Sequence, residues 1–310
     1  SLPLTARAAA IQLFTEAEAE HGAVLVSATC GLLCAARDGL SHAELQHALS
    51  AENAVVVATL ASETRSPHLP RVPSARLQLL LRTQLEPMLI ESLAAAHGGS
   101  SLLRWRHTLI REIAAERYAS DRRWHRSLAN LFGGVVPLPL PPIHLRDGSL
   151  ASLPADRRLP AQPLQMSCDD GAATWYNRRA MRELPAQLLG AGAYAELGET
   201  MISLAWIQTK LDALGVANIL EDFAMAQATH AELTAVPKAA PVAVATAPAA
   251  APAADGDDPL SEEDHALEEV CAFGDVLRCC ARVVQSDRSQ LEAQLLARIP
   301  HLLHTFTAGA

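Results

Sequence analysis

Hydrophobic residues recur at helical spacing through the first fifty positions of the chain. Between residues 4 and 20 the apolar side chains form one stripe, made by Ala10, Ile11, Phe14 and Ala17, which predicts an amphipathic helix ending near Gly22. The next segment, AVLVSATCGLLCAA, is apolar all round and predicts a buried helix closed by Arg37-Asp38-Gly39. Ser41 and Glu44 then have the spacing of a capping box at the start of a third helix.

A β-hairpin and further helices are expected after these elements. RLQLLLRTQL predicts a helix that follows a proline-broken loop at 62–74 and ends at Pro87. PMLIESL and SLLRWRH flank the turn AHGGSS and predict two paired strands. Helices are then expected at 108–118 and 121–132, the second capped by Ser120. Three helices, a hairpin and a closing helix together predict a winged-helix domain over residues 1–133.

The rest of the chain divides where its composition changes. Residues 134–173 hold seven prolines and are expected to form an insertion or loop. Helical spacing returns over 174–233, where glycines divide it into short helical hairpins. An Ala/Pro-rich linker is expected at 234–258 and a helical stalk at 259–310. The expected fold is mainly α: a winged-helix domain with a small β-hairpin, followed by a helical domain of hairpins or a bundle.

The composition narrows the class of protein. Half of the residues are hydrophobic, 4% are aromatic and the net charge is -9, which argues against nucleic-acid binding over the whole surface. The sequence has no signal peptide and no apolar run of membrane-spanning length, so no membrane contact is expected. Six cysteines without a C-x-x-C pair indicate reduced thiols in a cytoplasmic protein. Because the chain starts without Met and within a helical pattern, we expect a piece of a longer protein.

Motifs for catalysis or metal binding are missing from the sequence. It contains no phosphate loop, no G-x-S-x-G and no H-E-x-x-H. His301 and His304 lie three apart without a third ligand nearby. Cys30 and Cys34 lie in apolar sequence, which disfavours the reactive thiolate, and the acidic run 255–269 lacks the ligand pattern of a calcium loop. We therefore expect a non-catalytic chain with no metal site and no cofactor of its own.

A basic segment interrupts this otherwise acidic chain. From Arg104 to Arg126 it holds seven arginines against three acidic residues, a net charge of +4. It is either a solvated arginine face over packed helices or a surface for nucleic acid or a partner. The arginines that would serve such a surface are Arg104, Arg106, Arg122, Arg123 and Arg126. The aromatic residues that would stack on bases are Trp105, Tyr118 and Trp124.

Helical spacing inside this segment favours the packed interpretation. The buried stripe of its first helix is expected to consist of Leu109, Ile110, Ile113 and Ala114. Asp121 is expected to compensate Arg117, which lies four positions before it. Part of the positive charge should therefore be neutralised locally.

The same segment resembles a known family. LLRWRHTLIREIAAERYASDRRWHRSLANLF is similar to the end of the winged-helix domain of STAND nucleotidases of the NACHT type, in which aromatic, x, His, x, Leu precedes two helices. EAEAEHGAVLVSATCGLLCAARDGLSHAELQHALS resembles an earlier part of that domain. RRAMRELPAQLLGAGAYAELGETMISLAWIQTKL and ALEEVCAFGDVLRCCARVVQSDRSQLEAQLLARIP resemble the helices that lead to the repeats of NACHT and WD-repeat proteins. Telomerase protein component 1-like proteins belong to the same wider group.

The resemblance implies a role for one residue. In related proteins a histidine at the position of His107 touches the β-phosphate of bound ADP, although Thr108 replaces the aspartate that follows it in plant relatives. A histidine satisfied within the core is the alternative for His107. ADP or ATP would be held by the upstream nucleotide-binding domain of the parent protein, and none by this segment.

The implied function is that of a non-catalytic regulatory and scaffold segment of a signalling NTPase. It would couple the nucleotide state of the upstream domain to C-terminal interaction repeats, and through them to protein partners of an assembly. Two alternatives stay open: a nucleic-acid-binding or ribonucleoprotein component, and a structural adaptor in a larger assembly such as a ciliary complex.

Overall fold

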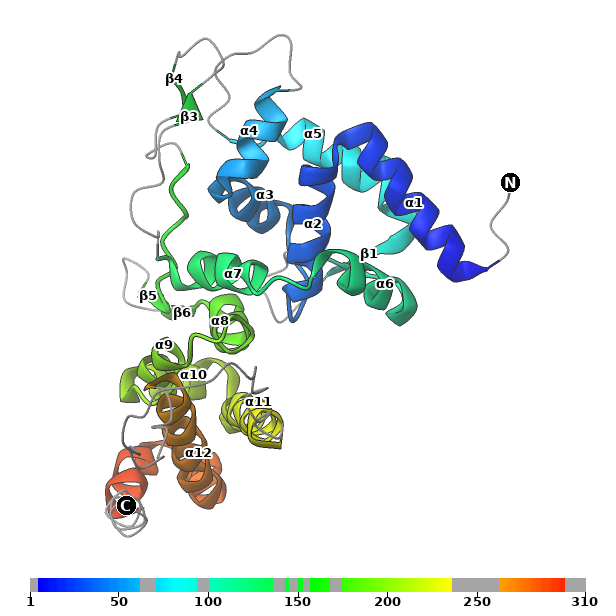
Figure 1. Cartoon of the computed structure of the whole chain (residues 1–310). Coiled ribbons are helices and arrows are strands. Elements are labelled where there is room, and N and C mark those ends of the chain that lie inside the picture. The colour runs from blue at the N-terminus through cyan, green and yellow to red at the C-terminus, as the bar shows by residue number, and fades with distance from the viewer. Residues whose placement is uncertain are drawn as a thin grey trace, which may run out of the picture. The chain divides into compact units, whose positions relative to one another are not determined.

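The computed structural model describes residues 5–61, 71–93, 101–135, 143–144, 150–152, 157–167, 174–235 and 262–298. The chain forms two compact units, Ser1–Gly192 and Ala193–Ala310. The first unit contains the winged-helix domain, and the second is built from helices (Figure 1).

The first unit begins with four helices. They are α1 (Ala6–His21), α2 (Ala23–Ala35), α3 (His42–Ala51) and α4 (Asn53–Ala61). Gly22 joins the first two with a φ of 91°, a conformation that glycine adopts without steric cost. The predicted capping box is present, because the Ser41 hydroxyl accepts from the Glu44 amide and the Glu44 carboxylate accepts from the Ser41 amide. The central helix is α2, which is buried along most of its length and packs against α1, α3, α4, α6 and α7.

Helix α4 is not anticipated by the sequence analysis. Its run Val55-Val56-Val57 is β-branched and therefore a poor helix former. Val55 and Val56 are buried in the structure, so packing against α2 and α3 outweighs intrinsic propensity. Part of the loop predicted at 62–74 lies outside the described residues.

A helical stretch of mixed geometry precedes the hairpin. It consists of α5 (Ser74–Leu79), the π-helical turn η1 (Leu80–Gln84) and the 3₁₀ turn η2 (Glu86–Met88). The predicted helix ends with the π-helical turn at Gln84, and Pro87, which was expected to end it, lies within the 3₁₀ turn that follows.

The hairpin pairs β1 (Leu89–Leu93) with β2 (Ser101–Trp105) in antiparallel register, with Glu91 opposite Leu103. Leu40, just before α3, forms a further bridge to Leu103. This bridge fixes the wing to the turn between α2 and α3. The residues between the two strands lie outside the part of the chain that the structure describes.

Two closing helices, α6 (Thr108–Tyr118) and α7 (Arg123–Gly133), follow the wing. The bounds of α6 are those predicted, but the expected cap of the second helix is wrong. Asp121, one residue after Ser120, accepts a hydrogen bond from the Arg123 amide at 2.8 Å. Asp121 also pairs with the Arg123 side chain, so the predicted compensation of Arg117 by Asp121 is wrong as well. Arg117 pairs instead with Glu18 of α1.

Aromatic side chains fill the core beneath the wing. Phe14 is fully buried and meets the rings of Trp105 and Tyr118 edge-on, with centroids 6.0 Å and 5.4 Å apart. Trp124 lies against Gly31, where any side chain would overlap its indole. Ile113 and Ala114 are buried as predicted. Leu109 was expected in the same stripe but is 39% exposed.

The described residues of the predicted insertion form three short strands, and the strand that pairs with the last of them, at Thr174–Tyr176, lies where the sequence predicted helix. The antiparallel pairs are β3 (Ile143–His144) with β4 (Leu150–Ser152), and β5 (Gln165–Ser167) with β6 (Thr174–Tyr176). Helix α8 (Arg178–Ala191) follows and packs along α7. Helix α8 lies within the helical domain predicted at 174–233, whereas the boundary between the compact units follows it, at Gly192.

The second unit is helical. Its elements are α9 (Tyr194–Met201), α10 (Leu204–Leu214), α11 (Val216–Ala235), α12 (Glu262–Ser286) and the 3₁₀ turn η5 (Arg288–Gln290), followed by helical residues 291–298. Gly215 separates α10 from α11 with a φ of 82°, in line with the expected division by glycines. Helix α12 packs against α9 and α11. Most of the predicted linker, and His301 and His304, lie outside the described residues. Over the described range, none of the helices is long and apolar enough to cross a membrane.

Candidate functional site

His107 lies on the surface, at the junction between the wing and α6. It is the N-cap residue of α6, in an extended conformation with φ -135° and ψ 144°, and its side chain does not cap the helix. The residue is exposed, so the alternative of a histidine satisfied within the core is wrong. The positive end of the helix dipole lies beside it, which favours an anion here.

A groove of about 360 Å³ runs along α6 from its first turn to its C-terminal end. Its lining residues are Cys34, Ala35, Thr108, Arg111, Glu112, Ala115, Ala119 and His125. Arg111 and Glu112 are exposed, while the small alanines belong to α2 and to α6 and its C-cap. The groove therefore combines small apolar side chains with hydrogen-bonding groups.

The protonation of His125 follows from its partner on α8. Gln187 donates both amide hydrogens, to the Ala35 carbonyl and to the Glu183 carboxylate, so its Oε1 faces His125 Nδ1 at 2.9 Å. An amide oxygen only accepts, and Nδ1 must therefore carry the proton. Burial lowers the pKa of His125 despite the bond to Gln187, so the ring is neutral and its Nε2 is a hydrogen-bond acceptor.

The two arginines predicted on the wing are held by the main chain. Arg104 donates to the Asp38 carbonyl at 2.6 Å. Arg106 donates to the Leu89 carbonyl through Nε at 3.2 Å and through a terminal nitrogen at 3.1 Å. The side chain of Arg104 thus packs on the turn between α2 and α3, and the side chain of Arg106 packs on β1, the other strand of the hairpin.

The three arginines predicted at the start of α7, Arg122, Arg123 and Arg126, are exposed. Arg123 lies over the Trp124 ring at 4.1 Å and pairs with Asp121 at 3.1 Å. Of the five predicted arginines, two thus bind main-chain carbonyls beside the wing, and three are exposed at the start of α7.

Two of the aromatic residues expected to stack on bases are buried. Tyr118 donates to Glu18, and Trp124 donates its indole hydrogen to the Tyr118 carbonyl at 2.8 Å. Trp105 packs edge-on against Phe14. The prediction of Tyr118 and Trp124 as stacking partners is wrong, because both rings belong to the core.

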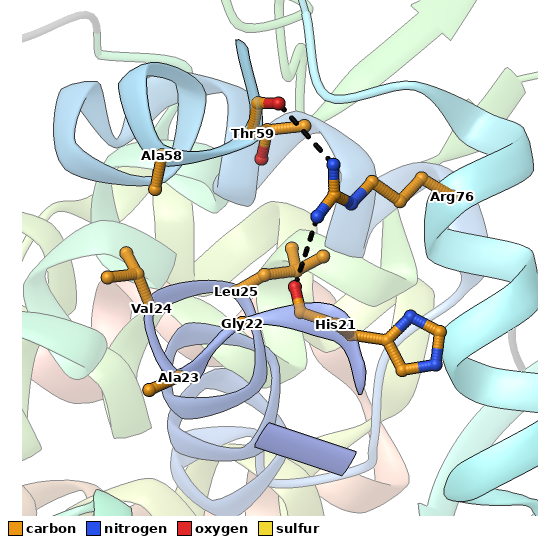
Figure 2. A pocket seen from close by; sticks show the side chains of 8 residues that line it. All are labelled: His21, Gly22, Ala23, Val24, Leu25, Ala58, Thr59 and Arg76. Atoms are coloured by element: carbon orange, nitrogen blue, oxygen red, sulfur yellow. Dashed lines mark hydrogen bonds between the residues drawn. The ribbon is translucent and has the colours of Figure 1, made fainter. Parts of the chain in front are cut away.

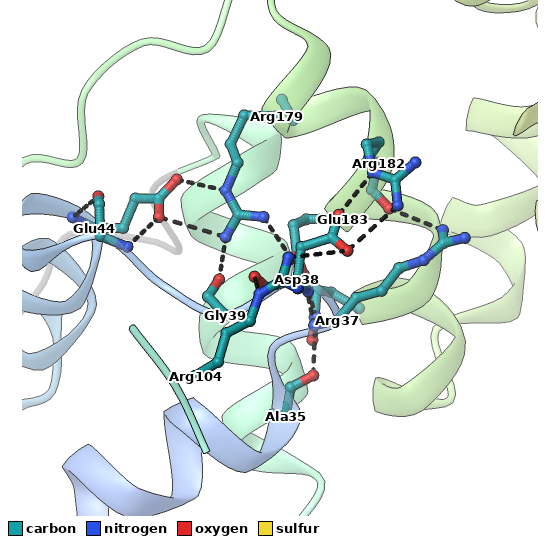
Figure 3. A network of polar contacts seen from close by, with 12 residues as sticks. Ala35, Arg37, Asp38, Gly39, Glu44, Arg104, Arg179, Arg182 and Glu183 are labelled. Carbon is teal, nitrogen blue, oxygen red and sulfur yellow. Dashed lines mark hydrogen bonds and ion pairs between the residues drawn. The ribbon is translucent and has the colours of Figure 1, made fainter. Parts of the chain in front are cut away.

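The most extensive polar contact in the first unit joins α8 to the turn between α2 and α3 (Figure 3). Glu183 has 0% exposure. Its carboxylate accepts from the amides of Arg37 at 3.1 Å and Asp38 at 2.8 Å. It also accepts from Arg179 at 2.6 Å and from Gln187 at 2.8 Å. All four donors converge on one carboxylate, which satisfies its acceptor capacity.

The arginines of α8 bind the acceptors of the same turn. Arg179 donates to Glu44 at 2.9 Å and to the Gly39 carbonyl, and Arg182 binds Asp38 at 2.6 Å. Burial lowers the pKa of Arg179, but Glu183 and Glu44 outweigh burial and leave that pKa raised. The guanidinium therefore stays charged, and Glu44 serves both the capping box and α8.

The sequence does not reveal this cluster. Its members on α8 are Arg179, Arg182, Glu183 and Gln187, spaced i, i+3, i+4 and i+8, and they share one face of a helix. The sequence holds one sign of this cluster: these polar residues share a face of a helix whose apolar residues predict that it is packed. Nothing in that spacing identifies a partner more than 130 positions earlier.

A second, smaller cavity of about 120 Å³ opens where α1 passes into α2 (Figure 2). Val24, Leu25 and Ala58 give it an apolar lining. Arg76 of α5 donates to the His21 carbonyl at 3.2 Å and to the Thr59 carbonyl at 3.4 Å. The arginine thus ties the end of α1 to α4, which is a structural role.

The paired cysteines of α2 do not form a reactive site. Burial raises the pKa of Cys30 well above its usual value and that of Cys34 to about 12, as the sequence predicts for thiols in apolar surroundings. Over the described ranges, no group of three His, Cys, Asp or Glu side chains could hold a metal ion.

Comparison with known proteins gives the family. Residues 9–124 match the family described as NWD1-like, winged helix-turn-helix domain. The chain is 32% identical over 237 residues to NACHT domain- and WD repeat-containing protein 1 of Homo sapiens, and 32% identical over 239 residues to the protein of that name from Mus musculus. Each alignment covers 72% of this chain and 14% of the relative, so the chain spans about one seventh of their length. No solved structure matches. The chain belongs to the NWD1-like family of NACHT-protein segments, with its winged helix-turn-helix domain at residues 9–124.

Proposed function

We propose that this chain is a non-catalytic regulatory and scaffold segment of a STAND-type signalling NTPase in the cytoplasm. It couples the nucleotide state of an upstream NACHT domain to C-terminal WD repeats. The names of the two relatives, which include both a NACHT domain and WD repeats, support this arrangement. The ADP or ATP is bound by the upstream domain, and this segment supplies one contact to it.

The observation that carries the proposal is the exposed His107 at the N-terminal end of α6. A ring N–H there can donate to a phosphate oxygen, and the helix dipole favours the same charge. Binding of ADP through this contact favours a closed arrangement of the parent protein, and its loss favours an open one. The segment changes populations and performs no chemistry.

Measurement of ADP release from the full-length protein tests this function. His107→Ala removes a hydrogen bond to a charged group, worth about 1.5–3 kcal/mol, so ADP should dissociate roughly 10- to 100-fold faster. His265→Ala is the matched control, because His265 is an exposed histidine on α12. An off-rate equal to that of the control would contradict the role of His107.

Nucleic-acid binding is the second candidate, favoured by the exposed Arg122, Arg123 and Arg126 on α7. Binding of RNA and DNA at two salt concentrations tests it, with Arg122→Ala and Arg123→Ala expected to reduce the salt dependence.

A further inference from the structure

We propose that the turn between α2 and α3 is a carboxylate-binding site that α8 fills from within the same chain. Release of Glu183 from this site is the step that separates the winged-helix domain from the helix leading to the second unit. The inference rests on the proposed coupling function and names the contact through which coupling passes.

The turn has the chemistry of an anion site. Arg37 and Asp38 direct adjacent backbone amides at one carboxylate, at 3.1 Å and 2.8 Å, as in the amide nests that bind anions. Arg37 also donates its side chain to the Arg182 carbonyl at 3.1 Å. The amides need an acceptor because a buried, unpaired N–H is costly, and Glu183 supplies it.

The ligand of this site is a helix of defined pattern. Beside the carboxylate of Glu183, Arg179 reaches Glu44 and Gly39, and Arg182 reaches Asp38. The guanidinium of Arg179, four residues before Glu183, and that of Arg182, next to Glu183, therefore match the acceptors between α2 and α3. The sequence R-x-x-R-E-x-x-x-Q defines the class of helix that can dock here.

The contact is suited to release as well as to docking. A buried ion pair adds little net stability, because the desolvation of both charges offsets their attraction. Helix α8 is also the last element of the first unit, and the boundary at Gly192 follows it directly. A change in the position of α8 thus reaches the second unit through the chain itself.

The docked helix is also connected to the groove along α6. Gln187 holds Glu183 with one amide hydrogen and faces His125 with its oxygen. His125 lines the groove. An occupant that moves the His125 ring therefore disturbs the glutamine that supports the docked carboxylate.

Hydrogen exchange of the full 310-residue chain tests the proposal. Glu183→Gln keeps the shape of the side chain but removes the charge that holds both amides. Peptides covering residues 36–40 and 178–191 should then exchange at least tenfold faster, while those covering α2 and α6 keep their protection. Glu91→Gln makes the same chemical change on an exposed position of β1, and this control should leave every peptide unchanged.

Gly190→Ala provides a second, independent variant. A methyl group there would overlap the ring of His125 on α7, so it should push α8 away from α7 and give the same pattern of exchange. Equal acceleration in all peptides of the first unit, in either variant, would make α8 an inseparable part of one core and overturn the proposal. Unchanged exchange at 36–40 and 178–191 would also overturn it.

This experiment needs no nucleotide, so its failure and that of the His107 test can be told apart. If His107→Ala leaves ADP release unchanged while Glu183→Gln releases α8 selectively, the docking site is supported and its proposed use in coupling is contradicted. If His107→Ala speeds ADP release while Glu183→Gln does not release α8 selectively, the nucleotide contact is supported and the docking site is contradicted.

Discussion

The two units bury charge in different ways. In the first unit, Glu183 binds backbone amides 145 and 146 positions away in the sequence. In the second, Lys210 pairs with Asp222, twelve positions away on the next helix, and the two residues are 1% and 3% exposed. One contact joins distant segments, and the other joins neighbouring helices of a hairpin.

This difference separates two uses of buried charge. The pair between Lys210 and Asp222 specifies how α10 lies against α11, a geometry that the short connection at Gly215 already restricts. The cluster around Glu183 specifies a contact that no short connection restricts, since the insertion separates α7 from α8. We therefore expect the pair of Lys210 and Asp222 to contribute mainly to stability. We expect the cluster around Glu183 to determine whether α8 moves with the winged-helix domain.

Breaking the local pair should have the largest effect on stability. Lys210→Met leaves Asp222 buried without its cation, which costs about 3–5 kcal/mol. Calorimetry or urea unfolding of the full chain should show the second unit unfolding earlier while the first is unaffected. The double variant Lys210→Met/Asp222→Leu replaces the pair by apolar groups and should recover most of the loss. A double variant as unstable as the single one would contradict this account.

The turn that receives α8 should be the next most sensitive. Gly39 has a φ of 87°, and a methyl group there would overlap the carbonyl oxygen of Leu103. Gly39→Ala should destabilise the first unit by about 1–3 kcal/mol, because overpacking adds to backbone strain. Gly215→Ala is the matched control, with a φ of 82° and no atom within 4 Å of the added group. Equal losses in thermal or urea unfolding would show that the contact with Leu103 adds nothing.

Mild acid should give the smallest effect, and in the first unit. Burial lowers the pKa of His21, His47 and His125 below the usual 6.5. The unfolded chain binds protons below about pH 6.5 that the folded unit resists. Stability is therefore fully present above that pH and declines as the pH falls below it.

Urea midpoints of the first unit, measured from about pH 7.5 to 5.5, check this sign. The chain carrying His21→Leu should show a shallower decline, because one of the three titrating groups is removed. A midpoint that rises on acidification would contradict the assigned direction.

Much of the fold could be predicted because the signals are local. Ser41 and Glu44 lie three apart and form the expected capping box, and the period of apolar residues gave the bounds of α6. Helix α4 could not be predicted this way, because its valines disfavour a helix and only burial of Val55 and Val56 stabilises it. Local patterns succeed where the interacting residues lie within one or two turns.

The candidate site could be predicted only in part. The resemblance drew attention to His107, and its exposure at the start of α6 depends only on neighbouring residues. The contact of Glu183 with the amides of Arg37 and Asp38 depends on the complete fold, and an amide leaves no mark in a sequence. For the same reason the sequence could not show that Tyr118 binds Glu18 of α1, or that Trp124 lies against Gly31 of α2.

Gln187 gives the groove along α6 its chemical preference without lining it. Because it fixes the proton of His125 on Nδ1, the other ring nitrogen, Nε2, is an acceptor, and a ligand that reaches it must donate the hydrogen bond. Exchange of this one glutamine for an acidic residue would retain an acceptor beside Nδ1, but exchange for a residue without one would free the ring to change tautomer. Selectivity at α6 is thus inherited from a helix that a ligand in the groove need not touch.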